Sequence, residues 1–302
     1  MRILVTGTNG LLGQKLVSAL RGRSGTELIA TSRGNDRTVR NGGYVYEPLD
    51  CTDRDAVLKI VQQYRPHAII HTAAMTNVDA CELDPVNCRL QNVAATENLV
   101  NAAKTCDAHF IHLSTDFIFD GEAGPYTEDD EPRPLSIYGQ SKLDSEHVVM
   151  NAGLNRWAIA RTIIVYGVAQ GLSRSNVVLW AKGALEKGEP IKVVHDQWRM
   201  PTLAEDLADG CIRIAEHQAT GIFNLCGPDG MSILELVQRV GAFFELDASV
   251  INPIDSASLK QPARRPPRTG FVLDKSRNVL GYTPRGFEQG LEILRQQLIR
   301  LA

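Results

Sequence analysis

The chain begins Met1-Arg2-Ile3-Leu4-Val5-Thr6-Gly7-Thr8-Asn9-Gly10-Leu11-Leu12-Gly13, and an apolar-periodic run with Leu16, Val17 and Leu20 follows. An apolar run that ends at a glycine is typical of a buried parallel strand. Glycines at the turn into the next helix let the backbone approach a pyrophosphate, whose charge is favoured at a helix N-terminus. The spacing is G-x-x-G-x-x-G rather than the commoner G-x-G-x-x-G. Its place between a strand and a helix predicts a dinucleotide-binding site.

The composition of this 302-residue chain fits one large domain, or a main domain with a smaller one. With a net charge of −3, the chain shows no electrostatic sign of a nucleic-acid or membrane partner. No apolar run is long enough to span a membrane, and the first strand leaves no room for a signal peptide. The six cysteines form no C-x-x-C pair, so we expect reduced thiols in a cytoplasmic protein.

Strand and helix patterns alternate regularly as far as Thr162, which predicts an α/β fold. The alternation is typical of a doubly wound parallel sheet of the Rossmann type. The last third is less regular, and we expect it to supply a smaller C-terminal substrate-binding lobe. The expected dinucleotide-binding domain covers 1–165 and is joined again by about 191–225. The expected lobe covers 166–190 and 226–302.

The end of the second predicted strand, Glu27 to Thr31, bears on the choice of cofactor. An acid at this position holds a ribose 2′-hydroxyl, whereas an arginine accommodates a 2′-phosphate. Here Ser32 and Arg33 follow, and the first acid is Asp36 in the next loop. The sequence therefore favours NADPH, with NADH as the alternative.

Two further stretches are placed to meet the cofactor. Asp50 ends a short strand, where it either meets the adenine amino group or caps the following helix. Ala73 and Ala74 follow the strand 67–71, and small residues there let a cofactor lie against the backbone.

Tyr138 and Lys142 are four residues apart on a predicted helix, so their side chains share one face. A phenol has a pKa near 10, so it needs help to exchange a proton near neutral pH. A nearby ammonium favours the phenolate. The hydroxyl of Thr115 or Ser114, at the end of the preceding strand, is placed to bind a substrate carbonyl. The pattern predicts acid catalysis by Tyr138.

Together these residues resemble the extended short-chain dehydrogenase/reductase superfamily and, within it, the dTDP-4-dehydrorhamnose reductase family. The similarity covers nearly the whole chain and is carried by the glycine loop and six further blocks. These are 73–79 (AAMTNVD), 114–121 (STDFIFDG), 134–142 (PLSIYGQSK), 161–167 (RTIIVYG), 196–202 (DQWRMPT) and 265–268 (RPPR). The resemblance implies NADPH-dependent reduction of the C4 keto group of a nucleotide-linked 6-deoxy sugar, dTDP-4-dehydrorhamnose to dTDP-L-rhamnose first among them.

The resemblance also implies residue roles. Tyr138 protonates the developing alkoxide, Lys142 holds the nicotinamide ribose and lowers the phenol pKa, and Thr115 orients the carbonyl. Arg265 falls where the family's arginine lies near the substrate diphosphate, with a structural salt bridge as the alternative. The expected cofactor-binding residues are Gly7, Asn9, Gly10, Leu11, Leu12, Gly13, Ser32, Arg33, Asp50, Ala73, Ala74, Tyr138 and Lys142. The expected substrate-binding residues are Thr76, Val78, Asp116, Phe117 and Arg265.

Three residues depart from the family pattern and leave the acceptor sugar open. Phe117 stands where tyrosine is frequent, Ile164 replaces a tryptophan, and Arg199 replaces a glycine. Some family members bind magnesium through a glutamate shortly after the glycine loop. Lys15 stands at that position here, so no metal site is predicted.

Two alternatives to this function stay open. One is a reductase or epimerase of another nucleotide sugar. The other is a non-catalytic, cofactor-binding regulatory subunit resembling that of methionine adenosyltransferase, although the retained Thr115, Tyr138 and Lys142 favour an enzyme. The expected partner is a nucleotide-sugar substrate, with neither nucleic acid nor membrane, and a homodimer is left open.

Overall fold

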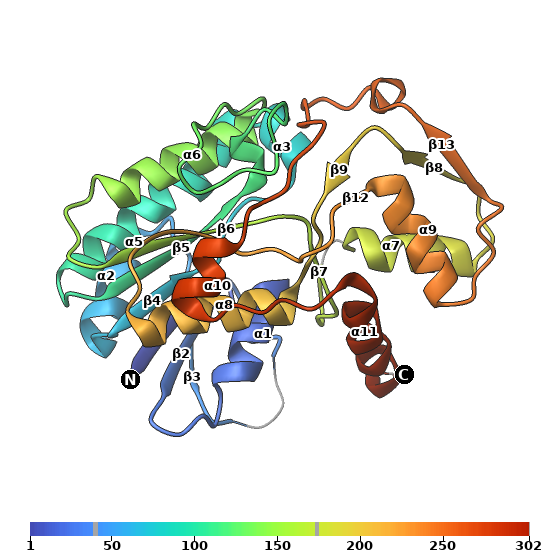
Figure 1. The fold of residues 1–302 in the computed structure, drawn as a ribbon. Helices are drawn as coiled ribbons and strands as arrows, with labels where there is room; N and C mark the ends of the chain where they lie inside the picture. Colours follow the sequence, from blue (N-terminus) through green and yellow to red (C-terminus); the bar gives the residue numbers. More distant parts are fainter. Residues whose placement is uncertain (39–41, 173–174, 302) are drawn as a thin grey trace.

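Seven parallel strands form the central sheet of the computed structural model, which describes residues 1–38, 42–172 and 175–301. Their order across the sheet is β11-β6-β5-β4-β1-β2-β3 (Figure 1). The strands are β1 Arg2–Thr6, β2 Glu27–Ser32, β3 Val45–Pro48, β4 Ala68–His71, β5 His109–Thr115, β6 Trp157–Thr162 and β11 Gly221–Asn224. Strand order reverses between β1 and β4, which makes this a topological switch point. The predicted doubly wound, Rossmann-type sheet is confirmed.

Helices cover both faces of the sheet. On one face lie α1 Leu11–Leu20, α8 Ala204–His217 and α10 Asp274–Leu280; on the other lie α2 Arg54–Tyr64, α5 Ala95–Lys104 and α6 Ile137–Met150. In β1, Ile3 and Val5 enter the core with α1 and α8, whereas Leu4 enters the core with α2 and α5. Because both faces are buried, the strand needs an unbroken apolar run rather than an alternating one.

The helical stretch between β4 and β5 consists of three consecutive segments, preceded by a short helix. The segments are α3 Val78–Leu83, α4 Pro85–Arg89, the π-helical turn η1 Leu90–Ala94, and α5. At this turn the backbone carbonyl of Asn92 accepts hydroxyl hydrogen bonds from Thr96 at 2.7 Å and Ser145 at 2.9 Å. Single π-turns of this kind are frequent at functional sites.

A smaller lobe packs beside the sheet and supplies one wall of the crevice. It holds α7 Val177–Glu186, α9 Ile233–Phe243 and α11 Phe287–Leu301, with the pairs β7 Val165–Tyr166 and β10 Thr202–Leu203, β8 Ile191–Val194 and β13 Ile251–Ile254, and β9 Trp198–Arg199 and β12 Met231–Ser232. Leu236, Leu291 and Phe287 share its apolar core. Two short 3₁₀ turns, η2 Asp116–Ile118 and η3 Ser256–Leu259, complete the described elements.

The structure moves two of the expected domain boundaries. The strand β8 pairs with β13 in the lobe, so the chain returns to the sheet at α8 rather than at about residue 191. The helix α10, expected in the lobe, packs against β11 and α8 instead. A short apolar run such as 191–194 does not specify which sheet will pair with it, and only tertiary packing decides this. No helix within the described ranges is long and apolar enough to cross a membrane.

Candidate active site

A cavity of about 1110 Å³ lies at the carboxyl ends of the central strands, between the sheet and the lobe. Every site residue expected from the sequence lines it. They are Gly7, Asn9, Gly10, Leu11, Leu12, Gly13, Ser32, Arg33, Asp50, Ala73, Ala74, Thr76, Val78, Thr115, Asp116, Phe117, Tyr138, Lys142 and Arg265. This is the edge at which ligands bind in open α/β sheets.

The glycine loop forms a tight turn between β1 and α1. Gly7 has φ +72°, and a Cβ there would lie 2.7 Å from the backbone nitrogen of Ala73. A Cβ at Gly13 would lie 2.3 Å from the carbonyl oxygen of Gly7, so neither position has room for a side chain. The N-cap Gly10 supplies no side-chain hydrogen bond, and the first turn of α1 holds no acid. The N-terminal N–H groups of α1 are thus left to bind an anion at the cavity.

Asn9 fixes the loop that follows β2. Its Nδ2 donates to the carbonyl oxygens of Arg33 at 3.1 Å and Asn35 at 2.9 Å, and its Oδ1 accepts from the backbone nitrogen of Arg37 at 2.9 Å. Arg37 lines the cavity together with Arg33, a contribution that the sequence analysis missed. The sequence signal for this contribution was a second arginine, Arg37, four residues after Arg33 in the same loop.

Asp36, the first acid after β2, does not line the cavity, and hydrogen bonds hold its carboxylate. The Asp36 carboxylate accepts from the backbone nitrogen of Thr38 at 2.8 Å and from the Tyr44 hydroxyl at 2.7 Å. Burial alone would raise its pKa, but these hydrogen bonds hold the pKa below its ordinary value. Asp36 is thus ionised and already paired.

Of the two alternatives for Asp50, capping of the following helix is wrong and contact with adenine stays a prediction; the carboxylate stabilises a turn at the cavity wall. Its Oδ1 accepts from the backbone nitrogen of Thr52 at 3.0 Å and from the Thr52 hydroxyl at 2.8 Å. The N-cap of α2 itself is Asp53, whose carboxylate accepts from the nitrogens of Asp55 and Ala56. Asp50 therefore shapes the loop that leads into α2.

Tyr138 and Lys142 lie one turn apart on α6, and Thr115 ends the neighbouring strand β5. The Ser136 side chain caps α6 by accepting from the backbone nitrogen of Gly139 at 3.2 Å. All three candidate catalytic residues are buried, although each also lines the cavity. Phe117 packs its ring edge against Tyr138, with centroids 5.7 Å apart.

Burial raises the pKa of the Tyr138 phenol above its ordinary value, and the charges of Asp116 and of two nearby thiols act in the same direction. A hydrogen bond with Thr115 lowers the pKa but does not offset burial. Desolvation of the phenolate in a closed site thus sets the direction of the shift. The lowering of this pKa by Lys142, which the resemblance implies, stays a prediction. Tyr138 is consequently a protonated donor at neutral pH.

The side chain of Asn92 connects the loop after β4 to α6, the helix that carries Tyr138 and Lys142. Its Nδ2 donates to the carbonyl oxygen of Met75 at 3.1 Å and to Ser141 Oγ at 2.9 Å, and its Oδ1 accepts from the Met75 nitrogen at 2.7 Å. The amide is 1% exposed. This buried amide thus joins two elements that line the cavity.

Arg199 lies behind the substrate side of the cavity. Its guanidinium is 2% exposed, its Nε lies 3.6 Å from Asp116 Oδ2, and it stands over the Phe117 ring at 5.8 Å. It also donates to the carbonyl oxygen of Pro266 at 2.7 Å. The Thr269 hydroxyl donates to Oδ2 of Asp116 at 2.5 Å. The arginine that replaces the family's glycine thus supports two residues that line the cavity.

Arg265 forms the structural salt bridge that the sequence left as the alternative to diphosphate binding. It makes a two-pronged ion pair with Asp79, at 2.7 and 3.1 Å, and it lines the cavity.

Ile164, which also lines the cavity, has an unusual backbone conformation with φ +31°. A β-branched residue with positive φ is strained, and such strain concentrates at functional sites.

Lys15, at the position where no metal site was predicted, forms an ion pair. Lys15 Nζ lies 2.8 Å from Glu205 Oε1 and donates to Gln297 at 2.9 Å. Within residues 1–38, 42–172 and 175–301, no group of three His, Cys, Asp or Glu side chains is placed to hold a metal ion.

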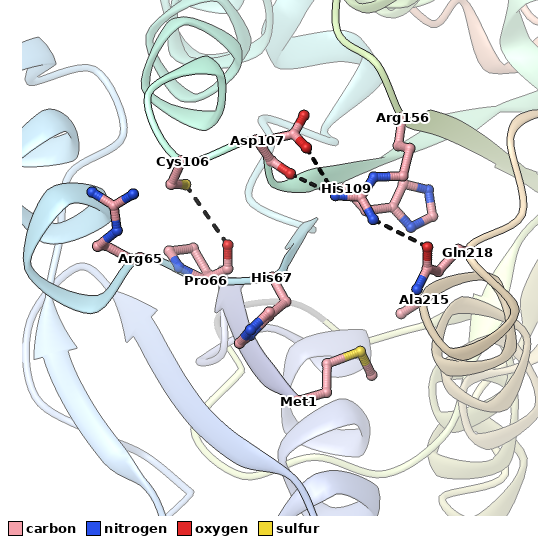
Figure 2. Close-up of a pocket in the computed structure, with 10 residues that line it drawn as sticks. All are labelled: Met1, Arg65, Pro66, His67, Cys106, Asp107, His109, Arg156, Ala215 and Gln218. Atoms are coloured by element: carbon pink, nitrogen blue, oxygen red, sulfur yellow. Dashed lines mark hydrogen bonds and ion pairs between the residues drawn. The ribbon is translucent and has the colours of Figure 1, made fainter.

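A second cavity, of about 410 Å³, lies at the opposite, amino-terminal edge of the sheet (Figure 2). Its arginines include Arg156, which donates to the carbonyl oxygen of Asp107 at 2.8 Å and to Gln218 Oε1 at 3.0 Å. None of the residues expected to act in binding or catalysis lines this cavity. The residues expected from the sequence thus gather in the cavity at the carboxyl edge.

Comparisons with known proteins agree with this arrangement. Residues 1–299 match the model of the RmlD substrate binding domain. The chain is 33% identical to methionine adenosyltransferase 2 subunit beta of Xenopus laevis over 261 residues, which cover 84% of this chain and 75% of the relative. It is 30% identical to a probable low-salt glycan biosynthesis reductase of Haloferax volcanii, with 97% of both chains covered.

A solved structure shows the same architecture. The dTDP-4-dehydrorhamnose reductase of Bacillus anthracis, in complex with NADP, superposes with a TM-score of 0.83 at 26% identity and covers 98% of this chain and 99% of its own. The match extends through both the sheet and the lobe. By sequence and by fold, the chain belongs to the RmlD-like family of extended short-chain dehydrogenases/reductases.

Proposed function

We propose that this protein reduces the C4 keto group of a nucleotide-linked 6-deoxy sugar with NADPH, and that dTDP-4-dehydrorhamnose is its substrate. The observation that carries the proposal is the convergence of Thr115, Tyr138 and Lys142 with the glycine loop around one cavity. The reductases of Bacillus anthracis and Haloferax volcanii support it, since one is a dTDP-4-dehydrorhamnose reductase and the other is named as a glycan biosynthesis reductase.

The residues at the cavity fit a dinucleotide. A pyrophosphate suits the uncapped N-terminus of α1, where side chains at Gly7 and Gly13 would collide with the backbone. Arg33 and Arg37 suit a 2′-phosphate, and the nearby Asp36 carboxylate is already held by hydrogen bonds from Thr38 and Tyr44. The relative from Bacillus anthracis was solved with NADP, which agrees with this assignment.

When bound, the cofactor would supply a hydride to the C4 carbon of the sugar. Tyr138 would donate its phenolic proton to the oxygen, because its raised pKa keeps it protonated at neutral pH. The Thr115 hydroxyl, which donates to Asp116 Oδ1 at 3.1 Å, would turn its single proton toward the carbonyl oxygen to orient it. The Lys142 ammonium would stabilise the negative charge that develops beside Tyr138.

Arg265 would recognise the nucleotide diphosphate. Its guanidinium faces the cavity, and its geometry suits bidentate binding of phosphate oxygens. Asp79 already pairs with it, so a diphosphate would compete with or join this ion pair. Thr76 lies in the loop before α3 and Val78 at the first residue of that helix, and both line the adjoining wall of the cavity.

The test follows NADPH absorbance as purified protein meets dTDP-4-keto-6-deoxy-L-lyxo-hexose, which upstream enzymes generate in the same reaction. We expect oxidation of NADPH and formation of dTDP-L-rhamnose. Tight NADPH binding without oxidation would contradict the proposed substrate, and the UDP- and GDP-linked 4-keto sugars are then compared in the same assay.

A second candidate function is a regulatory subunit, which the likeness to methionine adenosyltransferase 2 subunit beta favours. It requires cofactor binding but no working Tyr138. Mixing the protein with a methionine adenosyltransferase catalytic subunit distinguishes the two functions. A regulator changes the rate of S-adenosylmethionine formation, whereas a reductase leaves that rate unchanged.

A further inference from the structure

Lys142 makes its hydrogen bond on the floor of the cavity. Its Nζ lies 3.0 Å from Nε2 of His112, a residue of β5 that is 0% exposed. In the part of the chain that the structure describes, no other acceptor lies within hydrogen-bond distance of this ammonium. A buried ammonium without an acceptor is costly, so this contact determines where the lysine head group rests.

The contact fixes the protonation state of His112. An ammonium has donors only, so Nε2 must accept and the ring proton must sit on Nδ1. Nδ1 has no hydrogen-bond partner among the described residues. Burial, together with the charge of Lys142 and the neighbouring His71, lowers the pKa of His112 well below its ordinary value. The imidazole therefore stays neutral throughout the physiological pH range.

The position of His112 in the strand follows from the alternation of β5. Phe110 enters the core on the side of α2 and α5, and Ile111 enters the opposite core. His112, two residues after Phe110, therefore faces the layer that contains α6. In the sheet it stands beside His71 of β4, with ring centroids 5.5 Å apart. Thr6 holds His71 by a contact of 2.7 Å to Nδ1.

We propose that His112 is a positioning residue for Lys142: its neutral imidazole accepts a hydrogen bond from Nζ and holds the ammonium at the floor of the cavity, beside Tyr138. The inference rests on the proposed function for its catalytic meaning. A carboxylate at this position would bind the ammonium in a full ion pair. The imidazole binds it more weakly, so the lysine stays available to a cofactor hydroxyl.

The charged and titratable groups around Lys142 come from five elements. They are Glu146 and Tyr138 on α6, Cys88 on α4, His112 on β5, His71 on β4, and Arg161 on β6, which is paired with Glu146. Burial lowers the pKa of Lys142 to about 8, and the charges of Glu146 and Cys88 oppose this shift. A hydrogen bond to the ammonium favours the charged form, so loss of His112 should lower this pKa further.

The chain offers a matched control in His109. It lies at the other end of β5, is 1% exposed, and has no hydrogen-bond partner for either ring nitrogen among the described residues. It lines the amino-terminal cavity beside Arg156 (Figure 2), whereas Lys142 lines the other cavity. His109→Leu therefore makes the same change of side chain in the same strand without touching the lysine.

The experiment measures the titration midpoint of Lys142 in protein with ¹³Cε-labelled lysine, by NMR from pH 6 to 10.5, with Lys142→Met to assign the signal. We expect His112→Leu to lower the midpoint by about one pH unit. We expect His112→Gln, whose amide oxygen still accepts, to stay within about half a unit of wild type. His109→Leu should leave the midpoint unchanged. An unchanged midpoint in His112→Leu, or an equal shift in His109→Leu, would overturn the proposal.

The pH dependence of NADPH affinity, followed by nucleotide fluorescence, provides a second readout. At pH 6 we expect His112→Leu to bind within about two-fold of wild type. At pH 8 we expect several-fold weaker binding, because less of Lys142 is charged. Neither readout requires turnover. Failure of the nucleotide-sugar assay with a shifted lysine midpoint would therefore contradict the proposed function and leave the role of His112 standing.

Discussion

At the scale of single residues, the proposed chemistry depends on Tyr138. Tyr138→Phe removes the phenolic proton but keeps the ring that packs against Phe117. We expect kcat to fall by about 10³-fold, in the range of general acid catalysis, while the Kd of NADPH stays within about three-fold. Stopped-flow absorbance and fluorescence titration measure the two quantities.

The control for this change is Tyr64→Phe. The Tyr64 hydroxyl contacts Glu47 at 2.5 Å, outside the cavity. This variant should keep wild-type turnover. If Tyr138→Phe also keeps turnover, another group donates the proton.

Arg199 illustrates a residue whose role comes from charge burial. Arg199→Leu leaves the carboxylate of Asp116, which is 1% exposed, without its ion-pair partner. Removal of one member of a buried pair costs about 3–5 kcal/mol, so we expect a loss of about 3 kcal/mol in the free energy of unfolding. Urea titration measures this loss.

An ion pair whose arginine is exposed provides the comparison. Arg133 lies 4.0 Å from Asp120, and its side chain is 72% exposed. Arg133→Leu should change the free energy of unfolding by less than about 1 kcal/mol. Equal effects of the two arginine substitutions would contradict the importance of burial at Arg199.

At the scale of elements, two helical glycines have opposite expected effects. A Cβ at Gly13 in α1 would lie 2.3 Å from the carbonyl oxygen of Gly7 and 2.5 Å from Cα of Thr8. Gly13→Ala must therefore push α1 away from the glycine loop, and we expect NADPH affinity to fall at least about ten-fold with a lower Tm. A cofactor affinity that is unchanged would mean that the loop does not carry the pyrophosphate.

Gly183 in α7 is the control for the glycine substitution. A Cβ there meets nothing within 4 Å. Gly183→Ala should stabilise α7 by about 0.5–1 kcal/mol, because alanine has the higher helix propensity. Thermal unfolding followed by circular dichroism measures both variants under the same conditions.

At the scale of the whole molecule, buried histidines link folding to pH. Burial lowers the pKa of His71 to about 3 and of His109 to about 4, and the pKa of His112 also lies well below its ordinary value. In the unfolded chain these groups titrate near pH 6.5. As pH falls below 6.5 the unfolded state binds protons that the folded state does not, so stability falls.

The expected size of this effect is about 1.4 kcal/mol for each histidine between pH 7.5 and 5.5, or about 4 kcal/mol for the three. Urea titrations at the two pH values measure it. His109→Leu should reduce the loss by about one third. A stability that is constant over this range would mean that the three rings are protonated in the folded protein.

The sequence by itself determined the doubly wound sheet and the position of the site. Ile3, Leu4 and Val5 are all apolar, which is typical of a strand in a sheet that is covered on both faces. The glycines that follow predict a tight turn, and the structure leaves no room for side chains at Gly7 and Gly13. Because the carboxyl ends of parallel strands meet at one edge, residues as distant as Gly7 and Tyr138 could be assigned to one cavity from their order alone.

The tertiary structure decided what depends on long-range contact. It placed β8 in the lobe, paired Arg199 with Asp116, and set Lys142 against His112. Local patterns specify which elements form and which faces they bury. Pairing, desolvation and the electrostatic partners of a buried charge depend on residues far apart in sequence, so only the folded chain defines them.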